Sequence, residues 1–100
     1  MTLKSFETSG KAAVKIAATV ASASGALDGT SNAVRVVNSG PNSCRIKFSG
    51  PSGAALPATA NDMLLLPNTS EIFSKGSATF VAAICDVGTA AVEFTDGEGI

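Results

Sequence analysis

Short runs in which apolar and polar residues alternate recur along this 100-residue chain, and clusters of turn-forming residues separate them. In the stretch "AVRVVNSGPNSCRIKF", Val34 and Val36 fall on one face of the first run, and Cys44, Ile46 and Phe48 on one face of the second. Successive side chains of a β-strand point to opposite faces, so this period of two predicts strands. Runs of this length between regularly spaced turns are typical of a β-sandwich or a small barrel.

The alternation predicts an all-β fold, a single small β-sandwich or barrel of about seven or eight short antiparallel strands. Residues 12–22 form the first strand, although their alanine content is also compatible with a helix, and residues 24–32 form a loop. Residues 38–42 are expected to be a hairpin connection, with Gly40 able to adopt a positive φ. Further strands are expected at 54–60 (an edge strand, because of Pro57), 63–66, 70–74, 77–84 and 89–95, before a tail at 96–100.

A chain of this length implies one domain. Residues 1–11 lack periodicity and are expected to form an N-terminal arm, in which Leu3 and Phe6 anchor on an apolar surface, while residues 12–100 form the sandwich. Lys15 interrupts the apolar stretch that follows the arm, which argues against a secretory signal peptide. No apolar run reaches the length of a membrane-spanning helix.

The composition excludes several classes of function. The chain contains no His, Trp or Tyr, so it lacks the usual general base near neutral pH and the aromatic platforms that stack on sugars and bases. A net charge of -1 does not favour binding to nucleic acid or to an acidic membrane surface. We therefore expect no enzyme activity, no cofactor, no nucleic-acid partner and no membrane partner.

Neither the cysteines nor the acidic residues form a metal-binding motif. Cys44 and Cys85 lie in separate apolar runs, where buried, reduced thiols are expected; a disulfide remains open if the two strands face each other. Asp62, Asp86 and Asp96 do not have the spacing of a calcium-binding EF-hand loop. The sequence thus predicts no metal site.

Two sets of residues are candidates for contact with a partner. Arg35, Arg45 and Lys47 occupy the polar positions of the expected hairpin, where they form either a basic face for an acidic partner or an ordinary solvated strand face. The run "MLLL", residues 63–66, contains four consecutive apolar residues, of which strand alternation leaves about two facing outward. Those side chains are either a contact surface or covered by the N-terminal arm.

Four segments carry a resemblance to a known group of proteins: "AVRVVNSGPNSCRIKF", "ATANDMLLLPNTSEIF", "ATFVAAI" and "GTAAVEFTDGEG". In their order and spacing they resemble small virion proteins of tailed bacteriophages, of the decoration, cement or head-fibre-base kind. Cys44 and Cys85 depart from that pattern, in which aliphatic or small residues would be expected. The resemblance implies a small β-sandwich without an enzymatic site, assembled in the bacterial cytoplasm and located in the virion.

The expected function is that of a non-enzymatic structural protein that docks on the capsid shell. Its expected partners are further copies of itself, with a trimer favoured, and the major capsid protein or other virion proteins. A carbohydrate-binding or adhesin module of a fibre or cell surface is the alternative, and the missing Trp and Tyr weigh against it. The candidate interface residues are Leu3, Phe6, Arg35, Arg45, Lys47, Met63, Leu64, Leu65 and Leu66.

Overall fold

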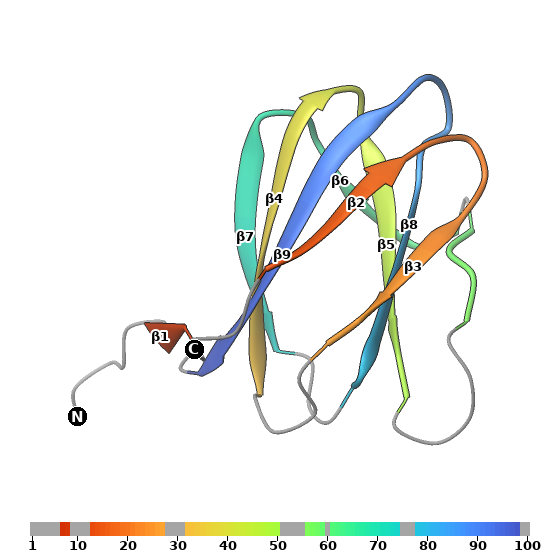
Figure 1. The fold of residues 1–100 in the computed structure, drawn as a ribbon. Helices are drawn as coiled ribbons and strands as arrows, with labels where there is room; N and C mark the ends of the chain where they lie inside the picture. The colour runs from red at the N-terminus through yellow and green to blue at the C-terminus, as the bar shows by residue number, and fades with distance from the viewer. Residues whose placement is uncertain are drawn as a thin grey trace.

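Two stacked β-sheets make up the structure, a computed structural model that describes residues 7–8, 13–27, 32–50, 56–59, 61–74 and 78–98 (Figure 1). These residues contain nine strands and no helix, which confirms the prediction of an all-β sandwich. The strands are β1 Glu7–Thr8, β2 Val14–Ala18, β3 Ala23–Ala26, β4 Ala33–Pro41, β5 Cys44–Ser49, β6 Met63–Leu65, β7 Thr69–Ser74, β8 Phe80–Ile84 and β9 Ala90–Glu98.

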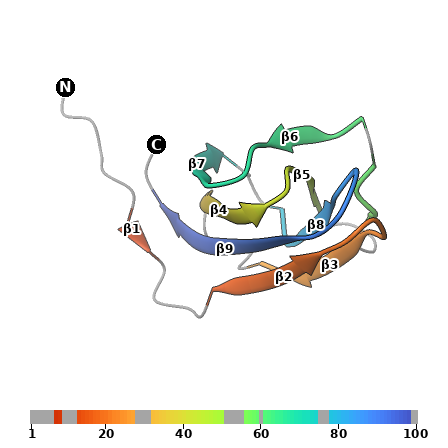
Figure 2. The same ribbon diagram turned by 90° about the horizontal axis from the view of Figure 1, so that it is seen from above.

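Sheet A has the strand order β2-β9-β4-β7, and the two-residue β1 pairs with the far end of β9. Sheet B has the order β3-β8-β5-β6, and every strand pair in both sheets is antiparallel. From β2 onward the chain passes from one sheet to the other at almost every connection, and Figure 2 shows the resulting two layers. This strand order is that of an eight-stranded jelly roll.

The core lies between the inward faces of the two sheets. Val34, Val36 and Phe94 of sheet A pack against a layer from sheet B that includes Ile46 and Val81. All five side chains are almost completely buried, and their neighbours along each strand point outward. The alternation in the sequence therefore grouped correctly the residues of β4 and β5 that face the core.

The connection at residues 38–42 is not a hairpin. β4 pairs with β7 and β9, whereas β5 pairs with β6 and β8, so the connection is a corner that passes from sheet A to sheet B. Buried Asn38 holds this corner: its Nδ2 donates to the carbonyl oxygens of Asn42, at 3.0 Å, and Leu65, at 3.2 Å, and its Oδ1 accepts from Gly40 N, at 2.8 Å. Alternation shows which side chains share a face of a strand, but not which sheet the strand joins.

The first two strands also differ from the prediction. Of the strand expected at 12–22, only Val14–Ala18 forms a strand, β2. It ends before Thr19, whose hydroxyl interacts with the backbone of Ala21. The expected loop at 24–32 begins instead with strand β3, which pairs with β8. Its Gly25 is a packing requirement, because a Cβ atom there would lie 2.6 Å from Val14 Cγ1.

Two further expectations are corrected in the second half of the chain. The expected tail begins as strand, since β9 continues to Glu98 and pairs there with β1 and β4. Residues 56–59 form no strand, although an edge strand was expected at 54–60. In β8, Phe80, Ala82 and Ile84 share the outer face, because Val81 and Ala83 point into the core.

Candidate functional site

One side of the sandwich is formed by the two edge strands β6 and β7. They follow each other in the chain, joined by the turn at 66–68, and each is the last strand of its sheet. In this turn Thr69 Oγ1 donates to the Leu66 carbonyl, at 2.6 Å, and Asn68 N donates to the Asn38 carbonyl, at 2.7 Å. An edge strand presents backbone N–H and C=O groups that its own sheet does not pair, and such groups can bind another strand.

Large aliphatic side chains are exposed along this β6–β7 edge. Leu65 is only 1% exposed, whereas Met63, Leu64 and Leu66 are 43%, 44% and 55% exposed. The sequence predicted about two outward residues in this run, and the structure has three. The register pairs Met63 with Ile46, which faces the core, but among the described residues no further strand lies beyond β6 to cover Met63.

Ile72 of β7 belongs to the same edge and was missed in the sequence. It is 43% exposed on the outer face of sheet A, directly across from Arg35 of β4. The signal was present in "SEIFS", because Phe73 packs against the core and its neighbour must therefore point outward. Leu3 and Phe6, the other apolar candidates, lie outside the described residues.

The three basic candidates do not form a common face. Arg35 lies on the outer face of sheet A, whereas Arg45 and Lys47 lie on the outer face of sheet B, on the opposite side of the molecule. Arg45 contacts the Asp86 carboxylate, with an Nη2–Oδ2 distance of 3.4 Å, and Lys47 Nζ lies 3.5 Å from Asp62 Oδ1. Of the two alternatives for these residues, a common basic face is therefore excluded, because the expected hairpin is a corner between two sheets.

The outer face of sheet B is covered by part of the chain itself. This part, which we call the strap, consists of residues 56–59 and 61–62. It lies between β5 and β6 in the chain and runs along the outer side of sheet B (Figure 2). The Ser22 hydroxyl accepts a hydrogen bond from Ala58 N, at 2.8 Å, and the Ser49 hydroxyl accepts one from Leu56 N, at 3.2 Å. Ala82 points outward from β8 and is nevertheless only 1% exposed. We call this side the covered face.

Asp62 fastens the end of the strap. Its Oδ2 accepts hydrogen bonds from Thr59 N, at 2.7 Å, and from Thr59 Oγ1, at 3.1 Å, and Arg45 Nη1 donates to the Asp62 carbonyl, at 3.1 Å. The backbone hydrogen bond from Thr59 holds the pKa of the Asp62 carboxyl below its ordinary value, and the Thr59 hydroxyl and Lys47 act in the same direction. The charged form of Asp62 therefore stabilises the attached strap.

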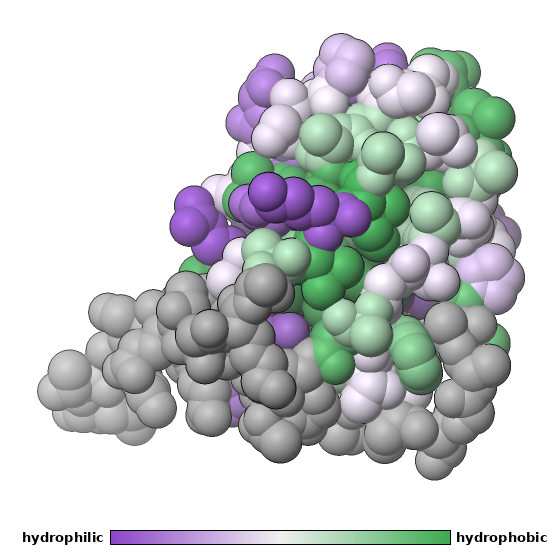
Figure 3. Space-filling view, viewed as in Figure 1, coloured by the Kyte–Doolittle hydropathy of each residue, from purple (hydrophilic) through white to green (hydrophobic). Residues whose placement is uncertain are grey.

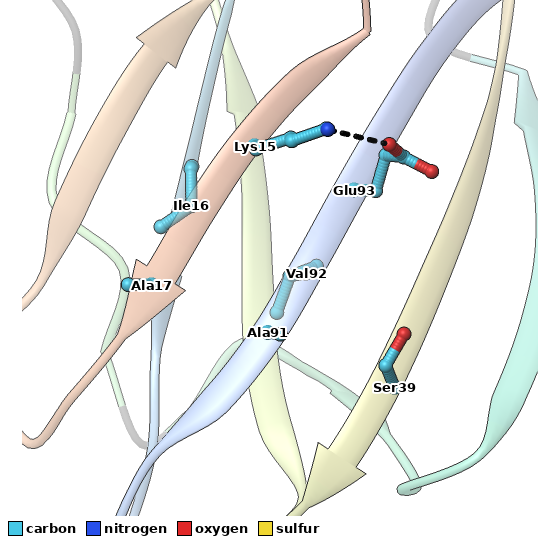
Figure 4. Close-up of a pocket in the computed structure, with 7 residues that line it drawn as sticks. All are labelled: Lys15, Ile16, Ala17, Ser39, Ala91, Val92 and Glu93. Carbon is cyan, nitrogen blue, oxygen red and sulfur yellow. Dashed lines mark ion pairs between the residues drawn. The ribbon is translucent and has the colours of Figure 1, made fainter.

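The outer face of sheet A has no comparable covering among the described residues, and we call it the open face (Figure 3). A hollow of about 330 Å³ lies on it between β2, β9 and β4, where the side chains of Ala17, Ser39 and Ala91 are small. Lys15 and Glu93 line the same hollow and form an exposed ion pair, with an Nζ–Oε1 distance of 3.9 Å (Figure 4). This concave surface is bordered by both signs of charge.

The two thiols are structural. Cys44 and Cys85 are free and buried, which confirms the prediction of buried, reduced cysteines. Burial, together with the nearby Cys85, raises the pKa of Cys44 to about 11, and burial and the Asp86 carboxylate raise the pKa of Cys85. A reactive cysteine needs a lowered pKa and access to solvent, so neither thiol has the properties of a nucleophile.

Within the described segments, no three His, Cys, Asp or Glu side chains gather in a way that could hold a metal ion. The same segments contain no helix of sufficient length and apolar character to cross a membrane. No protein-family model, curated protein or solved structure matches this chain.

Proposed function

We propose that the protein is a non-enzymatic structural component of a bacteriophage virion that docks through its β6–β7 edge. The observation that carries this proposal is that Met63, Leu64, Leu66 and Ile72 are all exposed on or beside the two edge strands, with Leu64 toward the outer face of sheet B and Ile72 toward that of sheet A. Several exposed aliphatic side chains on neighbouring edge strands are typical of a protein contact surface. Edge strands add backbone hydrogen bonds to such a contact.

The fold and the state of the chemical groups are consistent with this role. Jelly rolls occur in viral capsid proteins, and they also occur in lectins and cupins, so the fold alone does not decide the function. Both thiols are buried, and the carboxylates of Asp62, Asp86 and Glu93 are engaged in ion pairs. The thiols and these carboxylates therefore contribute to the structure, and the apolar edge is the strongest candidate site.

A contact of modest area is sufficient for docking on a capsid shell. A capsid repeats the same surface many times, and linked copies bind firmly because each bound copy raises the effective concentration of the next. We propose the major capsid protein or another virion protein as the partner. The protein then resides in the virion after assembly in the bacterial cytoplasm.

Co-sedimentation with heads assembled from the major capsid protein of the same genome tests this function. Wild-type protein should bind saturably, and Leu64→Asp should weaken binding because it places a charge in the desolvated contact. Val87→Asp is the control, since Val87 is 68% exposed in the β8–β9 turn and belongs to neither edge strand. Failure of the wild-type protein to bind any capsid would refute the proposal, and several clear hits on a glycan array would instead support the carbohydrate-binding alternative.

A further inference from the structure

The two cysteines lie opposite each other on neighbouring strands of sheet B. β5 and β8 pair with Arg45 opposite Ile84, so one further step of the same register sets Cys44 opposite Cys85. Both cysteine side chains belong to the core and are almost completely buried. The nearness of Cys85 is, after burial, the second cause of the raised pKa of Cys44. The two thiols are therefore neighbours in the core, although residues 45–84 separate them in the chain.

The backbone hydrogen bonds identify the type of this cross-strand pair. Cys85 N donates to the Thr19 carbonyl, at 2.8 Å, so the backbone of Cys85 points away from β5. The Thr79 carbonyl accepts from Leu27 N, at 2.7 Å, which gives every second residue from 79 to 85 the same orientation, toward β3. Cys44 and Cys85 thus occupy a non-hydrogen-bonded position of the β5–β8 pair, where opposing Cα atoms lie about 4.5 Å apart. A disulfide joins residues whose Cα atoms are about 4.4–6.8 Å apart, so the bond is within reach.

We propose that Cys44 and Cys85 are a redox pair, which closes to an internal disulfide when the protein is no longer in a reducing environment. The oxidant is a low-molecular-weight disulfide such as oxidised glutathione. One cysteine thiolate attacks it, which releases one glutathione and leaves a mixed disulfide; the other cysteine thiolate then attacks the protein sulfur of that mixed disulfide and releases the second glutathione. Two protein thiols thus become one S–S bond, and the oxidant is reduced to two thiols, which take up the two protons.

The folded protein protects the reduced pair. Burial raises the pKa of both thiols, so little thiolate is present while the core is closed. Cys85 is followed directly in the chain by Asp86 and Val87, which are exposed in the β8–β9 turn, and local opening of this turn gives a small oxidant access. We therefore expect the bond to form as the chain folds or during such openings, and to form slowly in the closed protein.

The contacts of the two sulfur atoms are compatible with a disulfide. Asn38 Nδ2 lies 3.7 Å from Cys44 Sγ, and it can donate to the sulfur of a thiol or of a disulfide. Cys85 Sγ donates to the Ala18 carbonyl, at 3.7 Å, and this weak contact is lost when the thiol proton leaves. The covalent loop from Cys44 to Cys85 contains the strap and strands β6 and β7, so the bond ties the β6–β7 edge to the β5–β8 pair. The bond itself does not depend on the proposed docking role.

Refolding in a redox buffer tests whether the bond forms. When the unfolded wild-type chain refolds with about 1 mM each of reduced and oxidised glutathione, most molecules should lose the mass of two hydrogen atoms. Protease digestion should then release a peptide pair that joins Cys44 to Cys85 and that separates on reduction. Two free thiols in the refolded protein, mixed disulfides with glutathione alone, or disulfides between chains would overturn the proposal.

A variant with a shifted thiol tests the register. Cys85→Ala combined with Ala83→Cys moves one thiol two positions along the inward side of β8, diagonal to Cys44. Diagonal cross-strand neighbours are about 7–8 Å apart, so this variant should form the internal bond at least about tenfold less than the wild-type protein in the same buffer. Equal yields of the internal bond in the two proteins would show that the native register does not direct it, and would overturn the proposal.

Thermal unfolding provides a second readout, which is independent of capsid binding. The oxidised wild-type protein should melt about 10 °C or more above the reduced protein, because the bond restricts the unfolded chain over a long loop. Cys44→Ala is the control and should melt at the same temperature with and without a reductant, since it cannot form the bond. An oxidised protein that melts at or below the temperature of the reduced one would overturn the proposal, because the fold would then oppose the bond.

Discussion

The two outer faces of this sandwich both contain small residues, but the chain covers one face and leaves the other exposed. On the covered face, two serine hydroxyls, Arg45 and Lys47 hold the strap to the sheet, and the outward-pointing Ala82 is buried. On the open face, Ala91 occupies an equivalent outward position in a central strand and remains exposed. The comparison shows that a small outward side chain is not by itself a sign of a contact surface, since the chain can supply the cover itself.

The strongest test of this difference places the same substitution on both faces. Ala82→Asp should lower the free energy of unfolding by about 3 kcal/mol or more, because it puts an unpaired charge beneath the strap. Ala91→Asp should change it by no more than about 0.5 kcal/mol, because the side chain reaches solvent. Urea unfolding at a protein concentration too low for association measures both. Equal losses would show that the strap does not bury Ala82; if Ala82→Asp does not fold, Ala82→Ser provides a milder comparison.

The β6–β7 edge allows a second matched pair within one strand. Leu65→Ala should cost about 3 kcal/mol, since it leaves a cavity in the core, whereas Leu64→Ala should cost about 0.5 kcal/mol or less. The same unfolding measurement applies, and co-sedimentation with capsids should show the opposite order for docking. A large loss of stability in the Leu64 variant would mean that Leu64 supports the fold and is not reserved for a partner.

Removing the serine hydroxyls that hold the strap should have a smaller effect. Ser22→Ala and Ser49→Ala each deprive a backbone N–H of its acceptor and should cost about 1 kcal/mol. Ser70→Ala is the matched control, because Ser70 lies on the open face and is exposed. Amide hydrogen exchange should also accelerate at Ala58 in the Ser22 variant. Unchanged exchange there would indicate that other contacts hold the strap.

The smallest expected effect is a dependence of stability on pH that Asp62 contributes. The pKa of Asp62 in the folded protein lies below its ordinary value of 3.8, so its contribution to stability is present above that value and is lost as the pH falls through the folded pKa. Between about pH 7 and about pH 3, the urea midpoint of the wild-type protein should therefore fall more than that of Asp62→Asn. Equal falls would exclude a role for the Asp62 charge.

Much of the fold follows from local patterns that the sequence contains. Alternation predicted most of the strands and grouped residues such as Val34, Val36 and Ile46, which are buried, because inward side chains recur at every second position of a strand. In the apolar run at 63–66 strand alternation predicted about two outward residues, and three of the four residues are exposed. That these residues bind a partner remains a prediction.

The errors arise where the structure depends on distant residues. Sheet membership is decided by pairing across the whole chain, so the corner after β4 looked like a hairpin and Arg35 seemed to join Arg45 and Lys47. Gly25 resembled a loop residue, although its small size is needed against Val14. The strap was mistaken for an edge strand, because nothing local reveals that its amides bind serine hydroxyls elsewhere in the chain.

Side-chain footprinting with hydroxyl radicals in the absence and presence of capsids tests the central claim most directly. The claim is that the β6–β7 edge is the surface that a partner covers. Ile72, Leu64 and Leu66 should become protected when the protein is bound to capsids, while Val87 and Leu56, which are also exposed, should react equally in both samples. Protection of Val87 or Leu56 in place of the edge residues, or capsid binding without any protection at the edge, would contradict it.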